Sequence, residues 1–216
     1  MNSHWPRLGF ILCLFLSAIN VPVSADQKLI FRTALDTPAA QYSQALLSEA
    51  YKAMGIQVEF ISVPFGRSLV ESNKGHLSGE LARVLDVTQS YPNLMAVPYV
   101  LFDTNVNLYV NQTKCAGCSL STVSSLVYVR GALILENMLH ALQPDIQLIP
   151  VSDTAAARQL YEQQKVDAVL FAAYQLSAAP QGFVSIMQTI KTVPDYHMLH
   201  KRYQPLLQAL AKTLFK

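Results

Sequence analysis

The segment Gly75-His76-Leu77-Ser78-Gly79-Glu80-Leu81-Ala82-Arg83 predicts a short strand centred on residues 77–81. Near the end of that strand, Glu80 and Arg83 place a carboxylate and a guanidinium three residues apart. The planar guanidinium, with its five donors, is well suited to hold a ligand carboxylate through two parallel hydrogen bonds. The alternative is a surface ion pair between Glu80 and Arg83, which would contribute little to stability.

Two strands and two helices precede this segment. Residues 29–35 predict a strand and residues 38–54 a helix, because their apolar residues recur at the corresponding spacings. Residues 56–63 predict a second strand, and a helix follows the turn Pro64-Phe65-Gly66-Arg67 as far as Gly75. This β-α-β-α-β order is typical of a parallel sheet with crossover helices, so we expect an α/β fold.

Polar and aromatic residues follow each strand of this first unit. Sheets of this kind bind ligands outside the carboxyl ends of their strands. The residues expected at those ends are Asp36, Thr37, Phe65, Arg67, Glu80 and Arg83. Three separate segments thus deliver such groups to one edge of the sheet, which predicts a binding site there.

The second half of the chain repeats the pattern. An extended stretch over residues 95–110 leads to a second β-α-β-α-β unit, whose last strand is predicted at residues 183–188. Residues 206–214 carry one apolar helical face, and we expect this helix to pack on the first unit. Two units of similar size predict a two-lobed chain.

Arg130 and Gly131 lie between a strand predicted at residues 126–129 and a helix predicted at residues 132–142. The free backbone N–H groups and the dipole at a helix N-terminus favour an anion. We therefore consider Arg130 and Gly131 a ligand contact from the second unit. A solvated surface arginine is an equal alternative.

The N-terminus has the features of a secretory signal peptide. Arg7 supplies a positive charge, residues 8–19 are almost entirely apolar, and Val23-Ser24-Ala25 fits a cleavage site. We expect residues 1–25 to be removed and the mature protein to be periplasmic. Cleavage removes Arg7 and lowers the net charge from +2 to about +1. Since the sequence has no basic stripe, we expect no nucleic-acid partner.

Two cysteines of the mature chain, Cys115 and Cys118, are expected to form a disulfide in an oxidising compartment. A redox dithiol is the alternative, but no amphipathic helix follows the pair. Zinc would need two further ligands, and His197 and His200 are more simply explained as structural or surface histidines. We expect no metal and no cofactor.

The order of motifs along the mature chain resembles the type II periplasmic solute-binding proteins. It is most similar to family 3, the polar amino-acid type, in its short proteobacterial branch. The segments that carry the resemblance are 64–69, 75–83, 91–94, 128–131, 165–168 and 196–201. The resemblance implies a first lobe of residues 26–103 plus 192–216, and a second lobe of residues 104–191 joined through hinge strands.

The resemblance also implies how a ligand is held. In that family two lobes close on a small solute, and an arginine of the first lobe grips its carboxylate. That residue would be Arg83, with Arg67 as the second candidate. The full set of expected ligand contacts is Arg83, Arg67, Glu80, Phe65, Asp36, Arg130 and Gly131. Ser78 stands where the family usually has an aspartate.

Three functions are compatible with this sequence. The first is capture of a small anionic or zwitterionic solute, amino-acid-like, by a monomer that presents it to an ABC permease or a sensor kinase. The second is a lyase or dehydratase on the same fold, with Glu80 as general acid or base. The third is a protein-interaction module that keeps the fold and binds no solute. We favour the first.

Overall fold

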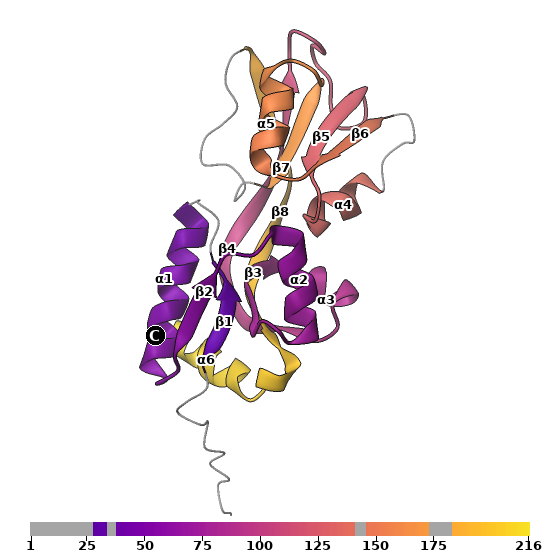
Figure 1. Ribbon diagram of the computed structural model, residues 1–216. Coiled ribbons are helices and arrows are strands. Elements are labelled where there is room, and N and C mark those ends of the chain that lie inside the picture. Colours follow the sequence, from indigo (N-terminus) through magenta and orange to yellow (C-terminus); the bar gives the residue numbers. More distant parts are fainter. Residues whose placement is uncertain (1–27, 34–37, 141–145, 173–182) are drawn as a thin grey trace, which may run out of the picture.

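A computed structural model describes residues 28–33, 38–140, 146–172 and 183–216 of the chain. The expected signal peptide and Asp36 lie outside the described residues. The described chain forms two lobes joined by two long strands (Figure 1). None of the helices in the described residues has both the length and the apolar character that a membrane-spanning helix requires.

The first lobe contains a parallel three-stranded unit with helices against it. Its elements are β1 (Leu29–Arg32), α1 (Pro38–Ala53), β2 (Val58–Ile61), α2 (Phe65–Lys74), β3 (Gly79–Val84) and α3 (Val87–Ser90). Strand β1 pairs in parallel with β2 on one side and with β3 on the other. The predicted β-α-β-α-β unit is therefore present.

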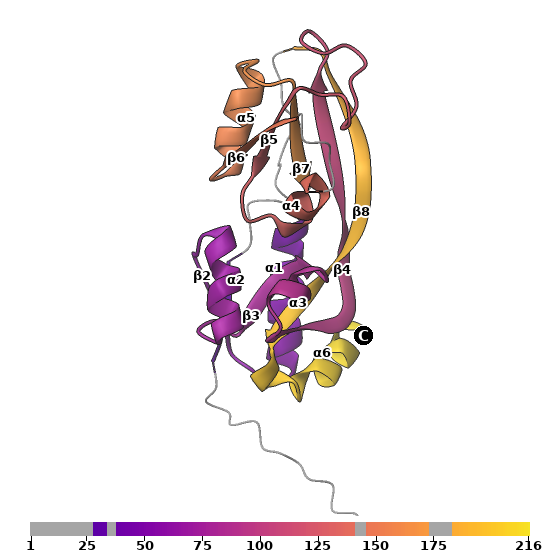
Figure 2. The same cartoon turned by 90° about the vertical axis from the view of Figure 1, so that its right-hand side faces the viewer.

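Strands β4 (Leu94–Asn111) and β8 (Ser185–His200) cross from one lobe to the other. They pair antiparallel from Leu94 opposite His200 to Asn111 opposite Ser185, and Figure 2 shows both running along one side of the molecule. The lobe boundaries expected at residues 103/104 and 191/192 fall inside these strands. The division of the chain at those residues stays a prediction.

The second lobe repeats the parallel arrangement. Its elements are β5 (Ser125–Val129), α4 (Leu133–Leu139), β6 (Gln147–Val151), α5 (Thr154–Glu162) and β7 (Ala168–Ala172). Helix α5 begins where the Asp153 carboxylate accepts a hydrogen bond from the Ala156 N–H, 2.8 Å away. The eight strands of the described chain form one mixed sheet in the order β2-β1-β3-β8-β4-β7-β5-β6.

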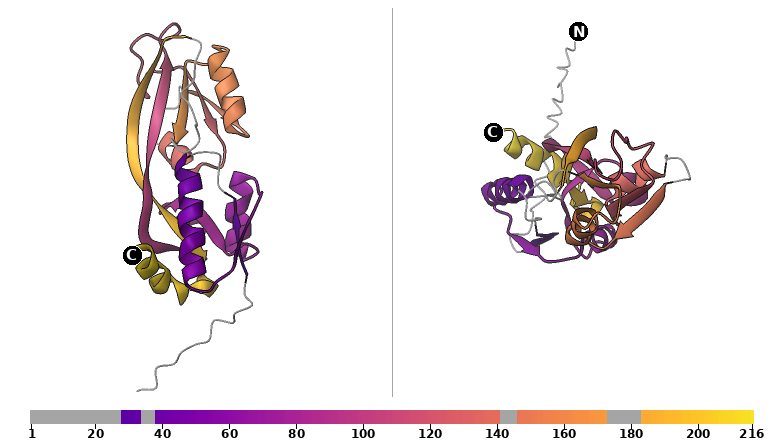
Figure 3. Two further views of the ribbon diagram at one scale, coloured as in Figure 1. Left: turned by 90° about the vertical axis from the view of Figure 1, so that its left-hand side faces the viewer. Right: turned by 90° about the horizontal axis from the view of Figure 1, so that it is seen from above.

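The chain then returns to the first lobe. A 3-10 turn (Lys201–Tyr203) leads into α6 (Leu206–Leu214), whose apolar face packs into the core of the first lobe, as the sequence predicts. The left-hand view of Figure 3 shows α6 below α1, and the right-hand view looks down on both lobes. The residues of that face are Leu206, Leu207, Leu210, Ala211 and Leu214.

Gly79 permits the close pairing of β3 with β8. A Cβ atom at this position would lie 1.9 Å from the carbonyl oxygen of Met198, so no other residue fits without moving the strands apart. This close contact places β3, which carries Glu80 and Arg83, against the crossing strand β8. The glycine therefore helps to position the predicted binding residues.

The expected disulfide is present, and the last strand is longer than the sequence predicts. Cys115 and Cys118 are joined as a disulfide, with their Cα atoms 5.6 Å apart. The last strand, predicted at residues 183–188, instead extends from Ser185 to His200. The prediction was too short because β8 is defined by its pairing with β4, which lies about 90 residues earlier in the chain.

Candidate functional site

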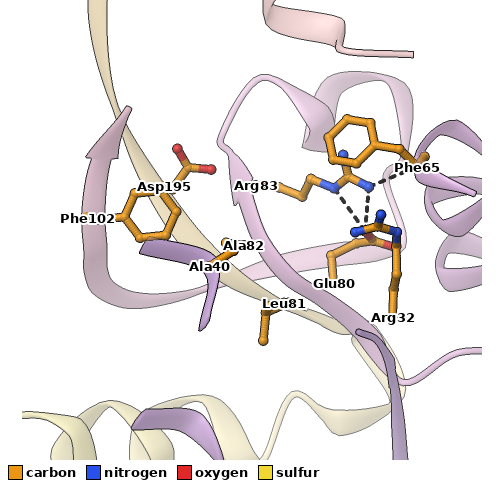
Figure 4. A pocket seen from close by; sticks show the side chains of 9 residues that line it. All are labelled: Arg32, Ala40, Phe65, Glu80, Leu81, Ala82, Arg83, Phe102 and Asp195. Atoms are coloured by element: carbon orange, nitrogen blue, oxygen red, sulfur yellow. Dashed lines mark hydrogen bonds and ion pairs between the residues drawn. The ribbon is translucent and has the colours of Figure 1, made fainter. Parts of the chain in front are cut away.

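A small cavity lies where the carboxyl ends of β1 and β3 meet the crossing strands. Its volume is about 30 Å³, which holds one or two water molecules, so a solute the size of an amino acid enters only if the walls move apart. Figure 4 shows the side chains around it. The lining residues are Arg32, Ala40, Phe65, Glu80, Leu81, Ala82, Arg83, Phe102 and Asp195.

Arg83 forms a buried ion pair with Glu80. The Glu80 Oε2 atom lies 2.9 Å from Arg83 Nε and 2.7 Å from Arg83 Nη2, and the two residues are only 1% and 5% exposed. The expected alternative of a surface ion pair is therefore wrong, because both groups are shielded from solvent. Removing one partner of such a pair leaves a buried charge and is strongly destabilising.

Two serines of α2 hold the Glu80 carboxylate in place. Ser68 Oγ donates to Oε2 at 3.0 Å, and Ser72 Oγ donates to Oε1 at 2.6 Å. Arg83 Nη2 also donates to Ser68 Oγ and to the Phe65 carbonyl, both at 2.9 Å. The network fixes the guanidinium from one side.

The Phe65 ring covers the guanidinium. The Arg83 Cζ atom lies 3.6 Å from the ring centroid, a cation–π contact. Nε and Nη2 of Arg83 donate hydrogen bonds to the protein, whereas Nη1 has no hydrogen-bond partner among the described residues. Nη1 is also accessible to solvent. Arg83 can therefore donate to a ligand through Nη1 alone.

Asp195 contributes a second buried charge to the cavity wall. It lies on β8, is 2% exposed, and accepts a hydrogen bond at Oδ2 from Thr104 of β4 at 2.5 Å. Within the described chain its Oδ1 atom has no hydrogen-bond partner. Burial raises the pKa of Asp195 to about 6, against the opposing effects of the Thr104 hydrogen bond and the Arg83 charge.

Arg32 lies at the end of β1, on the same edge of the sheet. Its Nε donates to the Val63 carbonyl at 2.7 Å and its Nη1 to the Thr33 carbonyl at 3.2 Å. Its guanidinium also lies 5.3 Å from the Phe65 ring centroid. Two arginines thus flank one aromatic ring at the cavity.

The structure brings together three of the predicted ligand contacts: Phe65, Glu80 and Arg83 all line the cavity. Arg67 does not, because its side chain is 72% exposed and lies 3.6 Å from Glu71 on the outer side of α2. Asp36 lies outside the described residues. A ligand role for these residues stays a prediction.

The second-lobe candidates lie apart from the cavity wall. Arg130 is exposed, and the Gly131 N–H donates to Glu136 Oε1 at 2.9 Å. The anion expected at this helix N-terminus is thus provided by the chain's own Glu136.

Gly131 instead makes a contact between the lobes. A Cβ atom built on Gly131 would lie 3.1 Å from the Cα atom of Gly66, in the first turn of α2. Two glycines therefore allow the backbones of α2 and the β5–α4 turn to touch. Gly66 is next to Phe65, so this contact between the lobes lies one residue from the cavity wall.

Sequence reasoning did not identify Arg32, Phe102, Thr104 or Asp195. Asp195 comes from a strand whose length depends on long-range pairing, and Thr104 becomes its partner only through that pairing. The available signal was an acidic residue next to the largely apolar run Tyr196-His197-Met198-Leu199. A charge within a predicted buried strand indicates a paired or functional group.

His197 is a structural histidine, in line with one of the two roles expected for it. Its Nδ1 donates to the Leu81 carbonyl at 3.1 Å and its Nε2 accepts from the Tyr51 hydroxyl at 2.7 Å. Burial lowers the pKa of His197 to about 4, so the ring is neutral at pH 7. Nowhere in the described residues do three or more potential ligands gather to hold a metal ion.

A scan against protein-family models found no match, and a search of curated proteins found none either. The solved structures, in contrast, include many similar ones. The chain has the two-lobe periplasmic binding protein fold. The sequence prediction of the fold is thus confirmed.

Three of the similar solved structures illustrate this fold. The amino-acid ABC transporter substrate-binding protein AbpA of Streptococcus pneumoniae, bound to L-arginine, is 14% identical with a TM-score of 0.67, and 87% of each chain is covered. A histidine kinase sensor domain similar to periplasmic binding proteins is 12% identical with a TM-score of 0.70, covering 88% of this chain and 89% of that chain.

The third is the ancestral amino-acid-binding protein AncCDT-1, described as a precursor of cyclohexadienyl dehydratase. It is 12% identical with a TM-score of 0.67, and 87% of each chain is covered. At such identities the likeness establishes the fold, while function depends on the residues of the site.

Proposed function

We propose that this protein is a periplasmic solute-binding protein that captures a small anionic or zwitterionic solute, amino-acid-like, through Arg83. The observation that carries this proposal is the arrangement of Arg83. Its guanidinium is buried, fixed by Glu80 and covered by Phe65, yet Nη1 is left for another acceptor in the cavity where β1 and β3 meet the crossing strands. A preorganised cation of this kind suits a carboxylate oxygen.

Binding would be coupled to the position of the lobes. The lining residues of the cavity all belong to the expected first lobe, and the second lobe touches that lobe at Gly66, next to Phe65 of the cavity wall. The second lobe would therefore swing away about β4 and β8 to admit a solute, and close again on it. Ligand contacts made only in the closed state would favour that state. The contact between Gly66 and Gly131 would mark closure.

The solute would be passed to a membrane partner. Two of the similar solved structures are described as an ABC transporter substrate-binding protein and as a histidine kinase sensor domain, which supports either an ABC permease or a sensor kinase as that partner. Export would depend on the signal peptide predicted at residues 1–25.

The test is isothermal titration calorimetry on Arg83→Lys. Lysine keeps a cation beside Glu80 but removes the Nη1 donor, so we expect affinity for the captured solute to fall at least about tenfold. The matched control is Arg158→Lys, because Arg158 is also paired with a glutamate, Glu162, at 2.8 Å but lies on α5. Equal affinity in the wild type and Arg83→Lys would contradict the proposal.

Asp195 favours a second candidate, a lyase on the same fold. Its pKa of about 6 lies in the range useful for a general acid or base, whereas Glu80, the residue considered from the sequence, is bonded to Arg83, Ser68 and Ser72. The similarity to the ancestral dehydratase precursor is compatible with this chemistry. Product formed from prephenate or arogenate by the wild type, and not by Asp195→Asn, would support it.

A further inference from the structure

Two buried, oppositely charged side chains line the cavity, and each has one polar atom that the described protein does not use. Arg83 offers Nη1 from β3, and Asp195 offers Oδ1 from β8. Figure 4 shows them on different walls of the same space. A site built in this way has one donor and one acceptor for a ligand that carries both charges.

The two charges differ in how they are compensated. Arg83 is neutralised by the Glu80 carboxylate at 2.7 Å. Asp195 has a neutral partner, Thr104, and no ion pair within the described residues. A buried carboxylate without a cationic partner is costly, and a ligand cation would remove that cost.

We propose that Asp195 selects the charge class of the solute. As a carboxylate it makes the cavity a site for a zwitterion, whose cationic group it accepts while Arg83 Nη1 donates to the solute's carboxylate. As a neutral carboxyl it makes the same cavity a site for a simple carboxylic acid. This inference rests on the proposed function and adds a residue that sets its specificity.

Protonation of Asp195 would switch between these two states near neutral pH. Burial, the largest effect, raises the pKa of Asp195 to about 6. Below that pH, binding of a cationic group would release the carboxyl proton to solvent. A simple carboxylate ligand would instead accept a hydrogen bond from the protonated carboxyl.

The charged groups around Asp195 are compatible with such a switch. From β3, Arg83 lowers its pKa, and from β4, Asp103 raises it. Glu80 and Arg32 line other parts of the cavity wall, and Phe65 and Ala40 bring no charge from α2 and α1. His197, two residues along β8, bonds instead to Tyr51 and Leu81.

The test compares solutes that differ by one amino group. Three pairs are titrated at pH 8 into the wild type and into Asp195→Asn. The pairs are L-alanine and propionate, L-phenylalanine and 3-phenylpropionate, and L-glutamate and glutarate. For at least one of these pairs, we expect the wild type to bind the amino acid at least about tenfold more tightly than the acid that lacks the amino group. We expect Asp195→Asn to lose or reverse that preference. The amide retains an oxygen that can accept from Thr104.

Asp103→Asn is the matched control, because Asp103 is the neighbouring acid on β4, is exposed and does not line the cavity. It should keep the preference of the wild type. In the wild type at pH 5, we expect the preference for the amino acid to shrink at least about threefold relative to pH 8.

An unchanged preference in Asp195→Asn would overturn this inference while leaving solute capture through Arg83 intact. An equal loss of affinity for both members of the pair would also overturn it, because it would show a purely structural role. If the wild type and Arg83→Lys bind one of these amino acids with equal affinity, the proposed capture of a solute through Arg83 is itself contradicted.

Discussion

At the scale of single residues, the proposed ligand contact Arg83 depends on the side chains that hold it in place. The structure shows a buried pair held by Ser68 and Ser72, so Glu80 positions the arginine that is proposed to bind. The sequence predicted the pair, but the two serines lie on α2 and approach Glu80 only in the folded chain.

Glu80→Gln should destabilise the protein by about 3 kcal/mol, because it leaves the buried Arg83 cation without a counter-charge. Urea unfolding measures this change in the free energy of unfolding. The control is Glu162→Gln on α5, which removes a partly exposed ion pair and should change stability by about 0.5 kcal/mol or less. Similar stability of the two variants would mean that the pair is not the buried support described above.

The two buried titratable residues of β8 should have opposite effects on acid stability. His197, with its pKa lowered to about 4, is protonated more readily in the unfolded chain, so it reduces stability as the pH falls from about 6.5 to 4. Asp195, with its pKa raised to about 6, is protonated more readily in the native state, so it increases stability as the pH falls from about 6 to 4. The two effects largely cancel in the wild type.

Asp195→Asn should therefore make the protein more sensitive to acid. Between pH 6.5 and pH 4 we expect the variant to lose on the order of 3 kcal/mol more stability than the wild type, since only the His197 effect remains. Urea unfolding at several pH values measures the difference. Parallel pH profiles for the two proteins would contradict the raised pKa of Asp195.

At the scale of elements, local patterns predicted most helices and strands, whereas long-range pairing decided the rest. Helix α1 and strand β5 follow the apolar periodicity of their own residues. Strand β8 does not, because its exposed residues Ile186 and Met187 and its buried His197 fit no single alternation. Consequently Asp195 could not be placed at the cavity from the sequence.

Gly131→Ala should weaken solute binding, because its Cβ atom would lie 3.1 Å from Gly66 and hold the lobes apart. Gly131 also has a φ of +83°, so alanine there would cost about 1–2 kcal/mol in any case. Gly55→Ala is the control: Gly55 has a φ of +71°, but a Cβ atom there meets nothing within 4 Å.

The two glycine variants should therefore lose similar stability, and only Gly131→Ala should lose affinity, by at least about threefold. Calorimetry on both variants measures this. Equal affinities for Gly55→Ala and Gly131→Ala would show that the glycine contact has no part in closure.

At the scale of the whole molecule, the fold was predictable and the site only partly so. Two β-α-β-α-β units and a returning helix define the architecture. The units follow the apolar patterns of successive segments, and α6 was predicted from its own apolar face although it packs on residues far earlier in the chain. The cavity wall draws on β1, α2, β3, β4 and β8, which are far apart in the sequence. The sequence therefore identified Phe65, Glu80 and Arg83 of the first lobe, and missed both Arg32 at the end of β1 and the residues on the crossing strands.

The most direct test of solute capture is thermal unfolding of the mature protein against amino acids, organic acids, polyamines and short peptides. A solute present at about 100 times its dissociation constant stabilises by roughly 2.7 kcal/mol, which for a chain of this size raises Tm by roughly 5 to 10 °C. We expect such a shift with at least one carboxylate-bearing solute, and a much smaller one in Arg83→Lys. A shift with polyamines alone, or a shift of the same size in Arg83→Lys, would contradict capture through Arg83.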